Sequence, residues 1–256
     1  MKRTLILSAA FASALVATSA SAADLPVYTK APAVAVVYDW TGYYIGTNVG
    51  YSFGRGTTNG TQTIGSLVAP TVVTPISGRA DVNGFVGGGQ LGYNWQHGAW
   101  VFGLEGDIQL SNERGSGDVC TGACPAGFVF TRDYKLDWFG TARGRVGFLP
   151  ADRILLYATG GLAYGHFSGS SSTLPMNFGT WTSTNAGWTV GAGVESALGA
   201  NWSVKLEYLY MDLGSVGGSS ATVGLNKWVF DTKFTDSLVR VGLNYKFGGG
   251  PIVARY

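Results

Sequence analysis

Charged side chains are scarce in this sequence of 256 residues, since Asp, Glu, Lys and Arg make up only 12% of it, where about 25% is usual in soluble domains. Its 17 basic and 15 acidic residues nearly balance, and nothing in this balance indicates a nucleic-acid partner. Apolar runs of about 20 residues, the length of a membrane-spanning helix, are also missing. Glycine, in contrast, occurs 40 times, and aromatic residues make up 13%. This composition is typical of a β-sheet that faces lipid on one side and packs small residues on the other.

Cysteine and histidine, which dominate zinc sites, occur only twice each. Cys120 and Cys124 have no histidine or third cysteine nearby, which fits poorly with the four ligands that zinc normally takes. In an exported chain these two cysteines are expected to form a small loop disulfide. The sequence therefore predicts no metal and no cofactor.

The two histidines narrow the possible catalytic chemistry. His97 falls in a predicted turn, but His166 and Ser168 share one face of a predicted strand. This spacing resembles the His-x-Ser of a small barrel deacylase that acts on lipid A, in which the histidine activates the serine. The acid that should orient the histidine is missing, because Glu195 on the next strand points inward at the opposite end. We therefore predict no catalytic residues.

Residues 1–22 have the features of a secretory signal peptide. Two basic residues precede an apolar run over residues 5–17, and an Ala-Ser-Ala sequence ends at Ala22. Cleavage follows such small residues, so the mature chain is expected to start at Ala23. Residues 23–39 are expected to form an extended periplasmic leader of low complexity.

Apolar and polar residues alternate between Trp202 and Tyr210, where Lys205 and Glu207 share the polar face. A period of two is that of a β-strand whose two faces meet different environments. Similar alternation recurs so that eight strands are expected, near residues 43–53, 84–95, 102–110, 136–148, 154–165, 188–198, 202–210 and 239–247.

The connections between these segments are alternately short and long. Short turns are expected at residues 97–98, 150–152 and 199–201, and long polar loops at residues 56–80, 111–134, 168–186 and 213–234. Alternation persists inside the second of these loops, so several strands should extend past the membrane. Outer-membrane barrels have short periplasmic turns and long external loops. We therefore predict an all-β fold, an eight-stranded antiparallel up-and-down transmembrane β-barrel over residues 40–247, with both termini in the periplasm.

A soluble eight-stranded barrel, such as a lipocalin, is the alternative architecture. It would expose the charged face of each strand, but that face is also rich in glycine, which cannot supply a solubilising surface. The apolar face instead carries aromatic residues near the strand ends, as an interfacial girdle would. These residues are Tyr43, Trp95, Trp138, Tyr164, Trp188, Trp202 and Tyr245.

The charged face should line a lumen that is just wide enough for side chains to fill. Five acidic and five basic residues form the predicted lumen charge network: Glu105, Asp107, Asp137, Glu195 and Glu207 with Arg143, Arg145, Lys205, Arg240 and Lys246. Because buried charges must be paired, a structural core is the favoured interpretation. Rearrangement of these pairs into a narrow solute path is the alternative, since rings of charge line pores.

Four segments, residues 26–32, 38–46, 84–94 and 239–247, resemble a family of small outer-membrane β-barrel surface antigens. Members of this porin-like family of Gram-negative bacteria are often called outer membrane immunogenic proteins and are related to the OmpA membrane domain. The resemblance runs through essentially the whole mature chain. It implies an integral protein of the cell outer membrane with a structural and surface-exposed role, of antigen or adhesion type. A narrow porin-like channel for small solutes is the second interpretation, and a lipid-modifying enzyme is the third.

The expected partners follow from this location. They are outer-membrane lipids and lipopolysaccharide, the barrel assembly machinery, and a host or surface ligand bound through the loops. The last predicted strand contains Tyr245 and ends at Phe247, which resembles the terminal aromatic signal that the assembly machinery reads. That signal usually ends the chain, whereas here a tail over residues 248–256 follows. Phe247 and Tyr256 are therefore both candidates for the signal.

Overall fold

The structure is a computed structural model that describes residues 38–65, 71–118, 130–173, 176–223 and 225–248. The predicted signal peptide with its cleavage site between Ala22 and Ala23, most of the leader, the Cys120–Cys124 disulfide and Tyr256 lie outside the described residues. Within the described part of the chain, no helix is long and apolar enough to cross a membrane.

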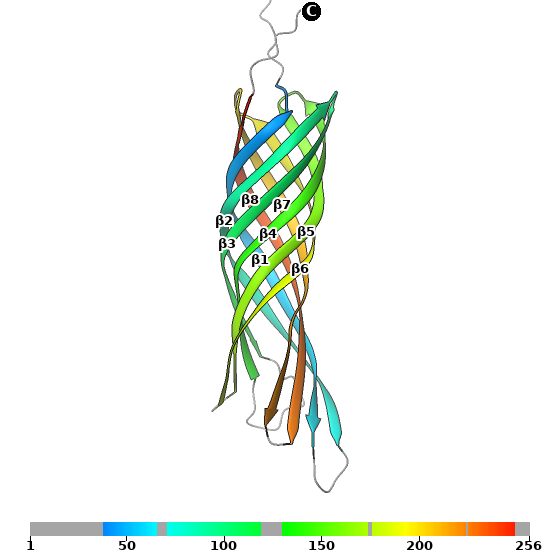
Figure 1. The fold of residues 1–256 in the computed structure, drawn as a ribbon, viewed down its shortest axis with the longest axis vertical. Coiled ribbons are helices and arrows are strands. Elements are labelled where there is room, and N and C mark those ends of the chain that lie inside the picture. The colour runs from blue at the N-terminus through cyan, green and yellow to red at the C-terminus, as the bar shows by residue number, and fades with distance from the viewer. Residues whose placement is uncertain (1–37, 66–70, 119–129, 174–175, 224, 249–256) are drawn as a thin grey trace, which may run out of the picture. The chain divides into compact units, whose positions relative to one another are not determined.

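Eight strands make up the fold and close into one barrel (Figure 1). In chain order they are β1 (Gly42–Ile64), β2 (Val72–His97), β3 (Trp100–Asp118), β4 (Phe130–Ala151), β5 (Ile154–Thr173), β6 (Met176–Ala197), β7 (Trp202–Val223) and β8 (Asn226–Lys246). Each strand pairs antiparallel with its neighbours in the sequence, and β1 pairs with β8 to close the ring. The predicted eight-stranded antiparallel up-and-down barrel is confirmed, because each strand pairs with two neighbours in a closed ring.

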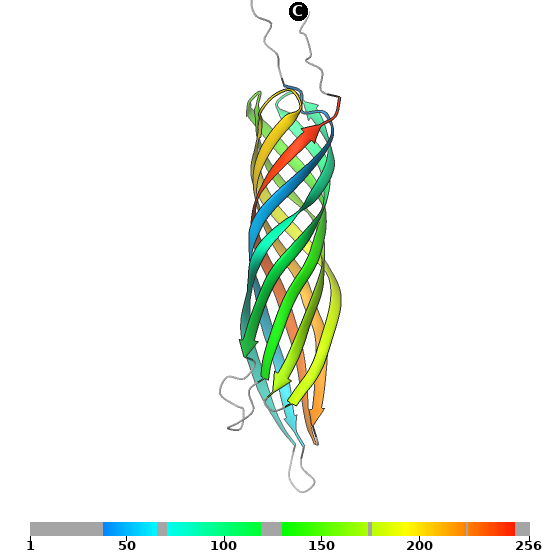
Figure 2. The same ribbon diagram turned by 90° about the vertical axis from the view of Figure 1, so that its left-hand side faces the viewer.

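The two ends of the barrel differ (Figures 1 and 2). At one end, called the turn end here, residues 98–99, 152–153 and 198–201 connect the strands. Gly98 has a φ of 60°, a conformation that glycine adopts without steric cost. The opposite end is called the loop end. The described residues before β1 and after β8 meet at the turn end, where the Phe247 backbone N–H donates to the Tyr43 carbonyl at 2.8 Å.

The strands are 19 to 26 residues long, although about 9 to 11 residues suffice for a tilted strand to cross a bilayer. The extra length lies at the loop end, where the strands run through most of the segments expected to be long loops. The extension expected from residual alternation in one loop therefore involves all eight strands. Polar segments rich in Ser and Thr can continue a ladder because its backbone hydrogen bonds do not depend on an apolar face.

An apolar band surrounds the turn-end half of the barrel. Its outward side chains belong to residues 43–53, 85–95, 102–110, 138–148, 154–164, 188–198, 202–210 and 239–247. Large apolar groups are exposed there, including Leu110 at 72% and Leu91 at 67%, and no outward position of these described segments carries a charge. Each segment has about the length that a membrane-spanning strand needs. The residues predicted as an aromatic girdle lie near the two borders of this band.

A bulge on β4 changes which residues face the lumen. The register shifts between Leu110 and Glu113 on β3, where Asp107 and Glu113 keep the same inward phase, and between Leu136 and Trp138 on β4, where the phase changes. A bulge inserts an extra residue and so reverses the in–out phase of the residues beyond it. The sequence pattern placed Leu136 outward and Asp137 inward, and both assignments are wrong. Leu136 is fully buried in the lumen, whereas the Asp137 side chain is 25% exposed.

Candidate functional site: a filled lumen

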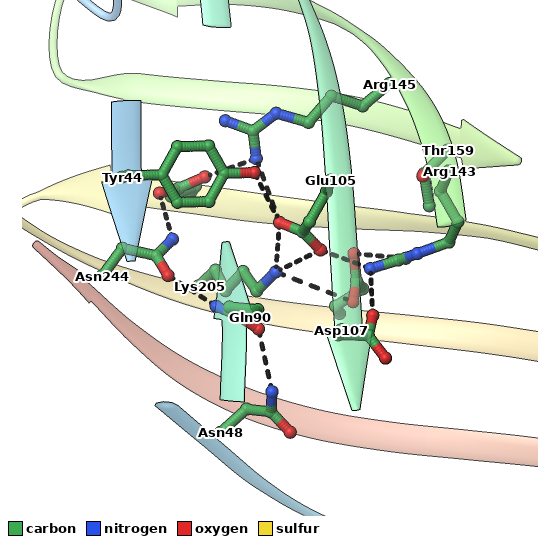
Figure 3. Close-up of polar contacts among 12 residues, drawn as sticks. Tyr44, Asn48, Gln90, Glu105, Asp107, Arg143, Arg145, Thr159, Lys205 and Asn244 are labelled. Carbon is green, nitrogen blue, oxygen red and sulfur yellow. Dashed lines mark hydrogen bonds and ion pairs between the residues drawn. The ribbon is translucent and has the colours of Figure 1, made fainter. Parts of the chain in front are cut away.

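Eight charged side chains from β3, β4, β6, β7 and β8 meet in the lumen, level with the apolar band. Figure 3 labels Glu105, Asp107, Arg143, Arg145 and Lys205 among them. All eight are at most 6% exposed. We call them the ion network, and its members are Glu105, Asp107, Arg143, Arg145, Glu195, Lys205, Glu207 and Arg240. Alternation alone predicted all eight of these inward positions.

Glu105 lies at the centre of the ion network. Its carboxylate accepts hydrogen bonds from Lys205 Nζ at 2.8 and 2.9 Å and from the Tyr44 hydroxyl at 2.7 Å. The Arg143 guanidinium donates to the same carboxylate and also to Asp107 Oδ2 at 3.0 Å. Hydrogen bonds from three other strands therefore fix this one carboxylate, and Arg240 and Arg145 lie 3.6 and 3.9 Å from it.

Arg240 links the remaining acids. Its Nη2 lies 3.0 Å from Asp107 Oδ2 and 2.6 Å from Glu207 Oε2. Arg143 Nη1 reaches Glu207 Oε1 at 3.1 Å. Because Arg143 and Arg240 bridge the same two acids, removing either cation would leave buried carboxylates with fewer partners.

Arg145 forms the part of the network closest to the turn end. Its Nη1 pairs with Glu195 Oε2 at 3.0 Å, and its guanidinium lies 4.9 and 5.3 Å from the ring centres of Tyr44 and Tyr157. The Tyr157 hydroxyl donates to Glu207 Oε1 at 3.0 Å. The two tyrosines therefore join cation–π contacts to hydrogen bonds with the acids.

The ion network is electrically neutral, since four carboxylates face four cations. Paired and hydrogen-bonded charges are the form in which a low-dielectric interior tolerates ions. Amides extend the hydrogen bonding around the network, since Gln90 donates to Asn244 and Asn244 donates to Glu195 (Figure 3).

Two residues of the predicted network lie elsewhere. Asp137 occupies the β4 bulge and faces the outer surface, where it pairs with Lys135 at 2.5 Å and accepts a hydrogen bond from Ser168 at 2.6 Å. Lys246 is buried at the turn end, donates to the Asp39 carbonyl and lies 4.5 Å from the ring centre of Tyr38. Asp137 is therefore not a lumen residue, and Lys246 forms no ion pair with the network among the described residues.

An apolar cap lies beside the network at the turn end. Six buried residues form this mouth cap: Tyr38, Trp40, Val101, Leu155, Tyr157 and Ala197. The Trp40 indole donates to the Asp152 carbonyl at 3.2 Å, which ties the residues before β1 to a turn on the far side of the mouth. One sequence signal indicates this cap, the aromatic pair Tyr38 and Trp40 just before the first strand.

A second apolar cluster fills the lumen on the loop side of the network. We call it the plug, and its members are Ala80, Val82, Val86, Tyr134, Leu136, Phe139, Ala163, Phe167, Leu209, Met211, Leu213, Phe234 and Leu238. The sequence pattern predicted charged residues in the lumen but did not predict this apolar cluster. Several of its members lie in segments expected to be loops, where no inward face had been assigned.

Two buried acids, Glu113 and Asp236, adjoin the plug and form no ion pair with any residue that the structure describes. Ser52 donates to Asp236, Ser111 donates to Glu113 at 3.0 Å, and one oxygen of each carboxyl has no hydrogen-bond partner. Burial raises the pKa of Glu113 to about 9, and the charge of Asp236 adds to the shift. Burial also raises the pKa of Asp236 to about 6. Both acids lie on the loop side of the apolar band, and Glu113 keeps its proton at neutral pH.

The histidine and serine with possible catalytic spacing do not hydrogen-bond to each other. His166 Nδ1 lies 2.9 Å from the Thr184 hydroxyl, and its ring stacks on Trp138 with centroids 5.9 Å apart. Ser168 donates to Asp137 rather than to His166. Asp137 is an acid near Ser168 that the sequence argument did not find, because the bulge moved it outward. His97, at the end of β2, is exposed.

No group of three or more metal-ligating His, Cys, Asp or Glu side chains occurs within the described ranges. The lumen therefore holds ion pairs and apolar side chains, and its arrangement supports packing and charge neutralisation. A closed barrel with an apolar outer band and a filled, neutral lumen defines the class of integral membrane β-barrels.

Comparison with known proteins identifies the family. The model for the outer membrane protein beta-barrel domain matches residues 9–247, and the chain belongs to this family. It is an outer-membrane protein. The 31 kDa outer-membrane immunogenic protein of Brucella melitensis is 41% identical over 248 residues, which covers 91% of this chain and 96% of the relative.

The chain is also similar to a second outer-membrane protein and to a solved structure. The 22 kDa outer membrane protein of Rhizobium leguminosarum bv. viciae is 36% identical over 162 residues, covering 62% of this chain and 66% of the relative. Among solved structures, the attachment invasion locus protein Ail of Yersinia pestis is 14% identical with a TM-score of 0.37, covering 80% of this chain and 99% of that chain.

Proposed function

We propose that this protein is a structural, surface-exposed barrel of the outer membrane, with an antigen-type or adhesion-type role, rather than a channel or an enzyme. The observation that carries this proposal is the filled lumen. A solute would have to pass the mouth cap, the ion network and the plug in succession. The relatives named as immunogenic outer-membrane proteins support the antigen role.

The orientation follows from the two ends of the barrel. In this proposal the turn end faces the periplasm, both termini are periplasmic, and the extended strands of the loop end project from the cell. A cleaved signal peptide over residues 1–22 exports the chain. The barrel assembly machinery reads Phe247 or Tyr256, and Tyr245 and Phe247 both lie on the lipid-facing surface, 36% and 52% exposed.

The partners in this proposal are outer-membrane lipids and lipopolysaccharide around the band, and a host or surface ligand at the loop end. A non-enzymatic role is supported by His166, whose ring contacts Thr184 and Trp138 and does not accept the hydrogen bond of Ser168. In the His-x-Ser arrangement the histidine is the base that activates the serine. Radiolabelled lipid A should therefore stay fully acylated in the presence of the protein.

Liposome swelling with the full-length protein tests the absence of a channel. We expect uptake of a monosaccharide at the rate of protein-free liposomes, with a conducting porin as the positive control. The variant with both Arg143→Ala and Arg145→Ala, once shown to fold, should also remain closed, because the plug still blocks the lumen. Clear size-limited uptake by the unmodified protein would overturn the structural role and establish the channel.

Labelling of intact cells tests the orientation. In a Cys120→Ser, Cys124→Ser background, Lys227→Cys at the loop end should react with a membrane-impermeant maleimide. Asp152→Cys in a short turn is the matched control and should react only after the outer membrane is permeabilised. The reverse pattern would contradict the proposed orientation.

A further inference from the structure

Arg114 and Lys135 lie directly opposite each other on β3 and β4. Both side chains point outward on the loop side of the apolar band, and the Lys135 side chain is 42% exposed. Like charges in directly opposite positions destabilise a sheet. Lys135 has one counter-ion, Asp137, whereas Arg114 forms no hydrogen bond or ion pair through its side chain with any described residue. An anion between the two cations would relieve this repulsion.

These cations line a hollow of about 560 Å³ on the outer surface of β3 to β6. Two rows of outward side chains cross the hollow along the ladder pairs. One row is Arg114, Lys135, Ser168 and Thr182, and the next is Ser116, Asp133, Ser170 and Thr180. Cations and hydroxyl groups suit a phosphate, and the hydroxyls with the Asp133 carboxylate suit the hydroxyl groups of a sugar.

The position of the hollow relative to the band restricts what can occupy it. Leu110, which is 72% exposed, and Trp138 are the last outward apolar residues of β3 and β4 before the hollow begins. A molecule seated in the hollow would therefore have its polar group above the band border and its apolar part against the band. This is the position of a lipid headgroup at a membrane interface.

We propose that this hollow binds the phosphorylated sugar headgroup of a glycolipid in the surrounding outer leaflet, with Arg114 and Lys135 holding the phosphate. The acyl chains of this lipid run along the band below Leu110 and Trp138. This site rests on the proposed orientation, in which the loop side of the band is the outer leaflet. It gives the general partner, outer-membrane lipid, a specific site and chemistry.

The chain offers a matched pair of control cations. Arg55 and Lys233 also lie outward on the loop side of the band, but each faces an acid on the neighbouring strand. Arg55 lies 3.5 Å from Asp81, and Lys233 lies 2.9 Å from Asp212. The control variant Arg55→Gln with Lys233→Gln removes the same charge as Arg114→Gln with Lys135→Gln but leaves the hollow intact.

The experiment uses the full-length protein refolded in detergent, with native mass spectrometry to measure bound lipid. Bis-phosphorylated lipid A should bind about tenfold more tightly than its dephosphorylated form, because hydrogen bonds to charged groups carry this much discrimination. Arg114→Gln with Lys135→Gln should abolish the preference, and the control variant should keep it. Heat-modifiable migration and circular dichroism establish that each variant is folded.

Three results would overturn the site. They are a preference retained in Arg114→Gln with Lys135→Gln, an equal loss in the control variant, and displacement of lipid A by an equal concentration of inorganic phosphate. The last result would indicate a site for soluble anions. Because solute uptake and surface labelling are measured separately, failure of the proposed structural role would remain distinguishable from failure of this lipid site.

Discussion

The two halves of the lumen are filled by opposite kinds of side chain. Level with the apolar band, four carboxylates and four cations neutralise one another in the ion network. Nearer the loop end, apolar side chains form the plug, and the adjoining acids Glu113 and Asp236 form no ion pair with any described residue. Both groups of side chains block the lumen. The ion network depends on the pairing of opposite charges, whereas the plug depends on close packing and on the proton that Glu113 retains. The two halves should therefore respond differently to substitution and to pH.

Removal of a network cation should have the largest effect. Arg240 is fully buried and contacts Glu105, Asp107 and Glu207, so Arg240→Ala leaves four buried carboxylates facing three cations. We expect a loss of about 3–5 kcal/mol in the free energy of unfolding, measured by urea titration in lipid vesicles. Arg55→Ala removes an exposed cation and should cost about 0–1 kcal/mol. Similar losses in both variants would show that the network is not a coupled buried unit.

Shortening a plug residue should have the next largest effect. Leu136→Ala should cost about 2–5 kcal/mol, because a buried leucine leaves a cavity when truncated. Leu162→Ala, at a position that is 68% exposed on the lipid-facing surface, creates no internal cavity and should cost less. Equal losses in the same urea titration would mean that Leu136 faces lipid, as the unbroken alternation of β4 suggests.

The acid pair should give the smallest effect, seen as a dependence of stability on pH. The pKa of Glu113 rises to about 9 on folding from about 4.3 in the unfolded chain. The folded protein therefore binds more protons, and stability present below about pH 4.3 is lost as the pH rises towards 9. Glu113→Gln should remove this loss, on the order of 1–3 kcal/mol. The free energy of unfolding is measured at pH 5, 7 and 9 for the unmodified protein and for Glu113→Gln. The same pH dependence in both proteins would contradict a buried proton on Glu113.

The alternation of apolar and polar residues predicted the members of the ion network, because inward and outward positions alternate with a period of two throughout the band. Glu105, Arg143 and Lys205 could all be assigned to the lumen on that basis. The same rule failed at Asp137, since a single extra residue at a bulge reverses the phase and the sequence does not mark its position. Tyr44 and Tyr157 occupy inward positions, but nothing in one strand shows that their hydroxyls reach acids on other strands.

By itself, the sequence determined the eight strands, the lipid-facing surface and the neutral set of inward charges, because each depends on residue type at a period of two. The tertiary structure alone decided that all eight strands extend beyond the band, that a plug fills the loop-end lumen and that Arg114 and Lys135 face each other. These features depend on the register between strands and on bulges. Register is fixed by the packing of all eight strands together, and no single segment encodes it.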